Sequence, residues 1–293
     1  MKMRHKIPFF FLTPALIFMV IFVVFPILNT IYISFLSSEG EFVGSQNYVE
    51  VLESKKMFNL EGFPKPPPLG AFIHNMVWIL IHLPLSIFSG LILAVILKDV
   101  KGASVIKTLV FLGMVTPMVV GGLIIRYTFE KDVGIVNGLL SFIGLENLTR
   151  SWTAYPDTAL FALIFGSVWL WTGFSMILYS AGLATIPKDY YEAAKVDGAS
   201  SLKMFYRITL PLLRPITITV ITMTILYELK IFDIVLVATY GGPGEASNVL
   251  AFQMWLYAFR YFEFNKAAVV ASLLTVLTII VTIPMIKFMV KKS

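Results

Sequence analysis

The hydrophobic pattern divides the chain into long apolar stretches separated by polar connections. A helix needs about 20 apolar residues to cross a bilayer, since each residue rises ~1.5 Å through ~30 Å of hydrocarbon. Six stretches reach that length: Phe9–Phe35, Leu69–Leu97, Ser104–Phe129, Thr158–Leu183, Pro215–Tyr240 and Lys266–Val290. The pattern therefore predicts an all-α integral membrane protein with six transmembrane helices.

Several of these stretches contain helix-breaking residues, such as Pro84, Pro117 and Pro284. In a bundle, neighbouring helices satisfy the carbonyl groups that such residues free, so we expect kinked spans. The first stretch follows a basic start, as a signal peptide does. Its apolar run exceeds the usual length of about 7–15 residues, and no small-residue cleavage site follows it. We expect it to be retained as a helix.

The composition agrees with a membrane protein. The 293 residues are 58% hydrophobic and 14% charged, whereas about a quarter of a soluble domain is charged. The sequence contains no cysteine, which excludes disulfides and thiolate metal sites. The net charge of +6 lies beside the apolar runs and forms no single patch, which favours membrane lipid over nucleic acid as a partner.

The distribution of basic residues predicts the orientation. Both ends of the chain and every second connection hold 14 of them, and the other three connections hold 6. The positive-inside rule therefore predicts a multi-pass chain in the cytoplasmic (inner) membrane with both termini in the cytoplasm. The first set is Lys2, Arg4, Lys6, Lys98, Lys101, Lys107, Lys188, Lys195, Lys203, Arg207, Arg214, Lys287, Lys291 and Lys292; the second is Lys55, Lys56, Lys65, Lys131, Arg150 and Arg260.

The connections on the outer side are too short to form a separate domain. One of them contains Val133–Leu145, whose pattern is typical of a short amphipathic helix at the membrane interface. We divide the chain into residues 1–68, with the amino end, the first helix and its outside loop, and residues 69–293, with five helices.

The third cytoplasmic connection, Ile186–Pro215, differs from the others because its pattern predicts two short helices around a turn. Asp189 is expected to cap the first helix, with Glu192 completing a capping box. Gly198 sits where a left-handed residue ends a helix, and Pro211 is expected to stop the second helix. A helix ~10 Å long is unstable alone in water, so this one requires a partner.

This connection also carries a long, gapped motif: Glu-Ala-Ala, a glycine four residues later, and an Ile-x-Leu-Pro ending. It resembles the EAA motif of binding-protein-dependent ABC importer permeases. In that family the loop is the coupling helix, which docks in a cleft of a cytoplasmic ATPase. The resemblance implies a type I ABC importer permease fold, and it implies ATPase-coupling roles for Tyr191, Glu192, Ala193, Ala194, Asp197, Gly198, Ile208, Leu210 and Pro211.

The resemblance covers nearly the whole chain. Phe42–Leu52, Ile231–Pro243 and the DGAS of Asp197–Ser200 look like segments of carbohydrate-uptake members, similar to maltose and glycerol-phosphate permeases. The chain departs from that pattern at Asn265-Lys266, where a glycine is common, and it lacks the large extra outside domain of some maltose permeases.

The resemblance implies a function as well as a fold. The chain is expected to be a permease subunit that moves a sugar or oligosaccharide by alternating access. Its expected partners are a cytoplasmic ATPase dimer, which binds ATP and Mg, a second permease subunit of similar size, and an extracytoplasmic solute-binding protein. The chain has no P-loop motif G-x-x-x-x-G-K-[ST], so we expect no ATP hydrolysis, no cofactor and no catalytic residue in the chain itself.

Charges within the fifth span are costly and usually face a cavity or one another. The functional interpretation is a substrate path formed by Tyr227, Glu228, Phe232 and Asp233, whose polar groups accept sugar hydroxyls. The alternative is an internal ion pair between Lys230 and Asp233, three residues apart. A proton-coupled sugar transporter, with Glu228 and Asp233 as a relay, and a scaffold or channel subunit remain open as other classes.

Other residues have simple structural explanations. The structural interpretation of Glu192 is that it serves only the capping box, and the basic residues of its loop follow from topology alone. His74 and His82 share a span but have no third ligand in view, so we expect no metal site. Aromatic residues outside the spans are typical of an interfacial belt, although they are also able to stack on sugars; they are Trp152, Tyr155, Trp255, Tyr257 and Tyr261.

Overall fold

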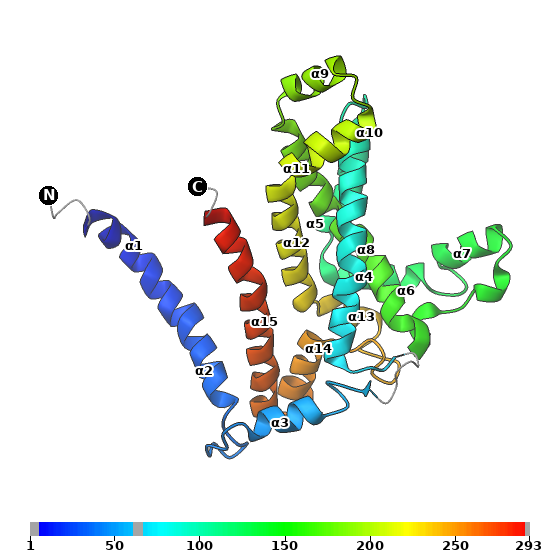
Figure 1. Ribbon diagram of the computed structural model, residues 1–293. Helices are drawn as coiled ribbons and strands as arrows, with labels where there is room; N and C mark the ends of the chain where they lie inside the picture. Colours follow the sequence, from blue (N-terminus) through cyan, green and yellow to red (C-terminus); the bar gives the residue numbers. More distant parts are fainter. Residues whose placement is uncertain (1–5, 61–66, 291–293) are drawn as a thin grey trace.

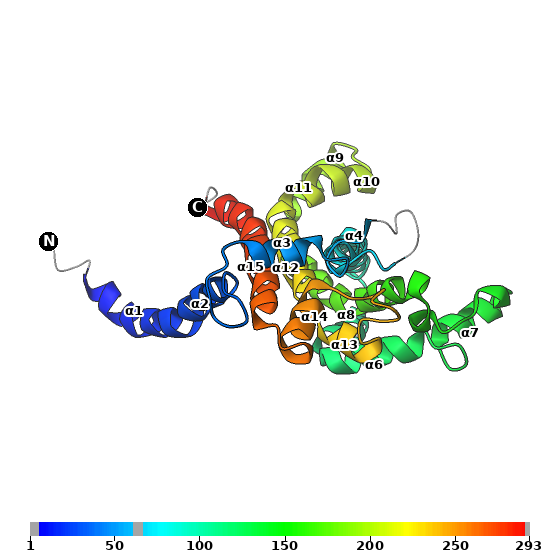
Figure 2. The same cartoon turned by 90° about the horizontal axis from the view of Figure 1, so that it is seen from below.

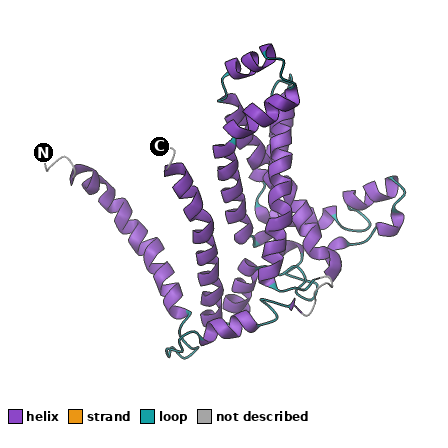
Figure 3. Ribbon diagram, in the orientation of Figure 1, coloured by secondary structure: helices purple, strands orange, loops and turns teal. Residues whose placement is uncertain are grey.

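The computed structural model describes residues 6–60 and 67–290. In these ranges all the regular secondary-structure elements are helices, and one isolated β-bridge joins Leu36 to Phe42. Figure 3 shows this all-helical character. The basic residues that lie outside the described residues are Lys2, Arg4, Lys65, Lys291 and Lys292.

The helices of the amino-terminal half include the first spans and a side hairpin. They are α1 (Lys6–Met19), α2 (Phe25–Ile33), α3 (Gln46–Glu53), α4 (Ala71–Ile96), α5 (Ala103–Val115), α6 (Met118–Thr128), α7 (Ile135–Phe142) and α8 (Pro156–Ala184). The carboxyl-terminal half contains α9 (Lys188–Val196), α10 (Ser201–Met204), α11 (Leu210–Leu212), α12 (Arg214–Leu229), α13 (Asp233–Ala238), α14 (Leu250–Trp255) and α15 (Phe264–Val290). Three π-helical turns, Val20–Val24, Phe205–Thr209 and Leu256–Arg260, adjoin them.

Four helices in the described ranges are long and apolar enough to cross a membrane without a break: Phe11–Ile33, Ala71–Ile96, Pro156–Ala184 and Phe264–Phe288. Two bent pairs raise the number to as many as six. The pair α5 and α6 bends by 105°, and the segment Ser201–Leu212 meets α12 at 66°. The all-helical membrane fold predicted from the sequence is confirmed, with sharper breaks than simple kinks.

The third span bends where Thr116 and Pro117 separate α5 from α6. Proline disfavours helical backbone at the residue before it, and Thr116 is extended. The predicted fifth span also breaks, because α12 ends at Leu229 and α13 begins at Asp233. The prediction of one continuous helix over Pro215–Tyr240 was therefore wrong, because the length of a mostly apolar stretch does not reveal where the chain changes direction.

The core of the bundle lies around α4 and α8, whose backbones approach closely. A Cβ added at Gly90 would lie 2.4 Å from Cβ of Ser175, so only glycine allows this approach. Small residues at such crossings are typical of membrane helix pairs. Helix α8 also contacts α5, α6 and α12, which makes it the central helix of the fold.

The first helix stands apart from this core (Figures 1 and 2). None of its described side chains is buried before Ser34, and Phe11 is 76% exposed. Its main contact is between α2 and α15. The connection after it is tied down by Asn47, whose Nδ2 donates to the carbonyls of Ser34 and Leu36, and by Asn265, which donates to Asn47 Oδ1 at 3.0 Å.

The two ends of the bundle differ. Figure 1 shows α9, α10 and the carboxyl end of α15 at one end, with α3 and α14 at the other. Helix α7 projects to the side, and its apolar residues Ile135, Leu139 and Phe142 are exposed. A helix within Val133–Leu145 is therefore confirmed, and its position at the membrane interface stays a prediction.

Candidate functional site

Helix α9 and the turn after it form the first candidate site. Gly198 has φ +72°, a conformation that glycine adopts without a steric cost. The N–H of Ala199 donates to the carbonyl of Ala194 at 2.9 Å, and the N–H of Gly198 donates to the carbonyl of Lys195 at 3.0 Å. This pair of bonds is a Schellman motif, which ends the helix as predicted for Gly198.

The predicted capping box is wrong. The residue that caps α9 is Pro187, Asp189 lies inside the first turn, and no side chain accepts a capping hydrogen bond. The extended backbone of Pro187 starts the helix two residues earlier than the pattern suggested, so Asp189 stabilises it only through the helix dipole. The exposed Glu192 therefore has no capping role.

Tyr191 connects α9 to the rest of the protein. Its hydroxyl hydrogen-bonds Oγ1 of the buried Thr209 at 3.0 Å. The ammonium of Lys98, just beyond α4, lies 4.7 Å from the centre of the Tyr191 ring, a cation–π contact. One side chain thus contacts both the segment that leads into α12 and the end of α4.

The second half of the loop is helical from Ser201 to Leu212. Ser200 caps it, because its hydroxyl accepts from the N–H of Lys203 at 3.3 Å. Pro211 does not end this segment as predicted. The π-helical turn Phe205–Thr209 widens the helix before it, which accommodates a residue without an N–H.

The other predicted coupling residues lie on this loop with different exposures. Ala193 and Asp197 are exposed, and Ala194 is half-buried. Ile208 and Leu210 are half-buried, Leu210 packs against the core around α4 and α8, and Pro211 is exposed.

The second candidate site lies where α12 gives way to α13. A hollow of about 460 Å³ opens here, lined in part by Trp171, Tyr227, Lys230, Phe232 and Asp233. The Tyr227 ring stacks on Trp171 with centroids 4.0 Å apart. The break between the helices places Lys230 after one and Asp233 at the start of the next, so they do not share a helix face. No ion pair joins them in the described structure, and that alternative is wrong.

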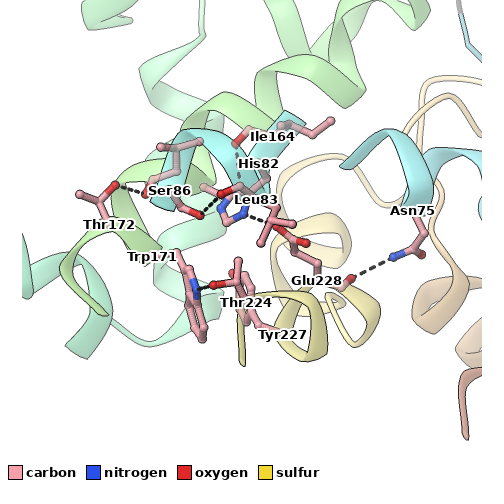
Figure 4. A network of polar contacts seen from close by, with 12 residues as sticks. Asn75, His82, Leu83, Ser86, Ile164, Trp171, Thr172, Thr224, Tyr227 and Glu228 are labelled. Atoms are coloured by element: carbon pink, nitrogen blue, oxygen red, sulfur yellow. Dashed lines mark hydrogen bonds and ion pairs between the residues drawn. The ribbon is translucent and has the colours of Figure 1, made fainter. Parts of the chain in front are cut away.

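Glu228 lies behind this hollow and does not line it. Its side chain is fully buried, and Oε1 is 2.6 Å from Nδ1 of His82 on α4, also fully buried. Asn75 on the same helix donates to the backbone carbonyl of Glu228 at 2.9 Å. Figure 4 shows this network beside Trp171, whose Nε1 donates to Thr224. These contacts fix the last turn of α12 against α4.

The same polar network extends to the loop before α14. Asn75 Oδ1 accepts from the N–H of Leu250 at 2.7 Å. The N–H of Leu69 donates to Nε2 of His74, so the ring's Nδ1 carries the proton that bonds the carbonyl of Asn248. For these α4 residues, the sequence predicted only that His74 and His82 bind no metal. Their signal was polarity inside an apolar span, which is costly unless the group has a partner.

The chain matches the model of the family described as "Binding-protein-dependent transport system inner membrane component" over residues 86–291. The protein belongs to this family, which makes it a permease subunit of an ABC importer and not an enzyme. The resemblance inferred from the EAA-like motif is thereby confirmed.

Several relatives match over almost the full chain. A probable ABC transporter permease protein of Pyrococcus horikoshii is 58% identical over 97% of this chain and 98% of its own. The trehalose/maltose transport system permease protein MalF of Thermococcus litoralis is 30% identical over 95% of this chain and 90% of its own. The crystal structure of a bacterial ABC transporter involved in the import of the acidic polysaccharide alginate matches with a TM-score of 0.79 at 20% identity. The match covers 97% of this chain and 95% of that chain. That likeness confirms the fold.

Proposed function

We propose that this permease moves a sugar or oligosaccharide across the cytoplasmic membrane by alternating access, driven by a separate ATPase dimer that binds ATP and Mg. The hollow beside the α12–α13 break carries the proposal. It offers stacked aromatic rings at Tyr227 and Trp171 together with the charged groups of Lys230 and Asp233. Aromatic faces suit the apolar face of a sugar ring, and charged groups suit its hydroxyls. The names of relatives that serve trehalose/maltose, lactose and alpha-glucoside transport support the same class.

The substrate path in this proposal comprises Tyr227, Phe232 and Asp233, with Glu228 as a buried support behind them. The other proposed partners are a second permease subunit, which covers the open side of the hollow, an extracytoplasmic solute-binding protein, and lipid around the bundle. In this proposal α9 and the carboxyl end of α15 face the cytoplasm and both termini are cytoplasmic, in accord with the distribution of basic residues.

In this proposal the ATPase moves the permease by displacing α9. Tyr191 transmits a displacement of α9 to α4 and to the segment before α12, because it contacts both. ATP binding draws the ATPase subunits together, and the bundle follows if its two states bind the closed ATPase differently. The proton-coupled alternative has no need for such a loop, and family membership favours the ATP-driven class.

Reconstitution of the complete transporter in proteoliposomes tests this function. ATP-dependent uptake of radiolabelled disaccharides, oligosaccharides and amino acids is compared for the native chain, Asp233→Asn and Ala193→Trp. We expect sugar uptake only, reduced by Asp233→Asn with the ATPase still bound, and loss of ATPase binding with Ala193→Trp. Uptake of amino acids in place of sugars contradicts the substrate class, and normal uptake by Ala193→Trp contradicts the role of α9.

A further inference from the structure

Two hollows that share lining residues lie along α4 and beneath α9, and we call the two together the groove. Its first part, of about 400 Å³, is lined entirely by apolar and aromatic residues, among them Phe88, Ile92 and Ile96 on α4 and Phe205, Tyr206 and Leu210 on the loop. The three α4 residues are spaced by four, so they share one helix face. Each is more than half exposed, and nothing else in the described structure covers them.

The second part of the groove is polar. A hollow of about 430 Å³ shares Val95 and Phe205 with the first part and lies beneath α9. Lys98, Lys188 and Lys195 line it together with two carboxylates, Asp99 and Glu192. The surplus of one positive charge complements a ligand that carries a single negative charge.

We infer that this groove binds one anionic phospholipid, with an acyl chain against Phe88, Ile92 and Ile96 and the phosphate diester beneath α9 near the three lysines. The dimensions fit this ligand. The helical rise from Phe88 to Ile96 is ~12 Å, and Lys98 lies two residues beyond the end of α4. This span is close to one leaflet, which is half of the ~30 Å hydrocarbon core. A single phosphate diester also matches the surplus charge of the lysine-lined hollow.

The position gives this lipid a consequence for transport. Its head group lies between the end of α4 and α9, where Lys98 contacts the Tyr191 ring. An anion held there attracts both lysines of α9 and Lys98 after α4, and so holds the coupling helix against the bundle. The assignment of this lipid to the cytoplasmic leaflet rests on the orientation proposed above, and an inverted chain would bind lipid in the outer leaflet. A failed lipid experiment leaves the proposed transport function intact.

Photo-crosslinking of the complete transporter in vesicles tests the inference. The vesicles contain phosphatidylcholine with either a phosphatidylglycerol or a phosphatidylcholine probe that carries a diazirine in one acyl chain. Labelled peptides are mapped by mass spectrometry. We expect the phosphatidylglycerol probe to label residues 88–96 and 205–210 preferentially. Ile92→Trp fills the apolar groove with the lysines intact, and Lys188→Gln with Lys195→Gln removes head-group charge; each is expected to reduce labelling about fivefold or more.

The matched control is Lys101→Gln with Lys203→Gln, which removes two exposed lysines that do not line the hollow. Its labelling is expected to equal that of the native chain. Co-purification of the ATPase is measured for every variant, so that a lost subunit is not mistaken for lost lipid. Equal labelling by the two probes, or labelling that either groove variant leaves unchanged, reduces the groove to ordinary contact with bulk lipid and overturns the inference.

Discussion

Nδ1 of His82 on α4 lies 2.6 Å from Oε1 of Glu228 on α12, and both side chains are fully buried. The two residues are 146 positions apart in the sequence. Their contact holds α12 at the turn before its break, which is where Lys230 and Asp233 enter the hollow. A buried polar pair of this kind acts as a fixed joint, because separating the partners leaves each one without a hydrogen bond in an apolar surrounding.

Removing one partner should therefore destabilise the fold more than removing both. His82→Leu leaves the Glu228 carboxyl buried without its partner, at a cost of about 1–3 kcal/mol, whereas His82→Leu with Glu228→Leu replaces both groups by apolar ones. We expect the double variant to recover much of the loss. The measurement is the temperature at which half of the detergent-solubilised protein remains monodisperse. A double variant as unstable as the sum of the two single ones contradicts a direct interaction.

Close packing of α4 on α8 gives a second prediction. In Gly90→Ala the new Cβ would lie 2.4 Å from Ser175 Cβ and 2.8 Å from the Met176 nitrogen, so the helices must separate. We expect a loss of about 1–3 kcal/mol, measured by the same thermal assay. The control is Gly138→Ala on α7, where nothing lies within 4 Å. This control is expected to be neutral or slightly stabilising, since alanine favours helix.

The parts of this structure that follow from local chemistry were predictable from the sequence. The membrane spans follow from the length of apolar runs, and the end of α9 follows from Gly198, which alone among its neighbours adopts positive φ easily. The motif around Glu192 identified the family, since its spacing covers two short helices and the turn between them.

The parts that depend on distant contacts were not predictable. The break between Leu229 and Asp233 lies within a stretch that the hydrophobic pattern predicts as one span. The alternative pairing of Lys230 with Asp233 therefore assumed a helix that does not exist. Glu228 was assigned to the path because a charge within a span usually faces a cavity, yet its partner His82 comes from another span. The start of α9 was misplaced because Pro187 caps it by backbone conformation, without the side-chain bond that the capping-box pattern implies.

The turn after α9 offers a test of the loop's shape. At Gly198 an added Cβ would meet nothing within 4 Å, so the φ of +72° is the only source of strain. Gly198→Ala should cost about 1–2 kcal/mol locally and tilt α9 from its docking position. Gly198→Asn should cost less, because asparagine tolerates this conformation. Stimulation of the ATPase by the loaded binding protein is expected to fall in the order Gly, Asn, Ala. Equal stimulation for Asn and Ala argues against a backbone effect.

The contacts of Tyr191 lead to a prediction about transmission. Tyr191→Phe removes the bond to Thr209 but keeps the ring beneath Lys98, and we expect a modest loss of stimulated ATPase activity of about two- to fivefold, the worth of one hydrogen bond. Tyr191→Ala removes both contacts and should cost about tenfold or more, because each contact contributes about 1 kcal/mol. Basal ATPase activity and co-purification of the ATPase report whether docking itself survives.

Thr209→Val and Tyr190→Phe separate this transmission from general damage to the loop. Thr209→Val removes the other partner of the same hydrogen bond and should match Tyr191→Phe, and combining the two should add no further loss. Tyr190 is 55% exposed beside Tyr191, so Tyr190→Phe is expected to leave the stimulated activity unchanged. If Thr209→Val has no effect while Tyr191→Phe does, the Tyr191 hydroxyl acts on the ATPase itself, and the path from α9 into α12 must run through other residues.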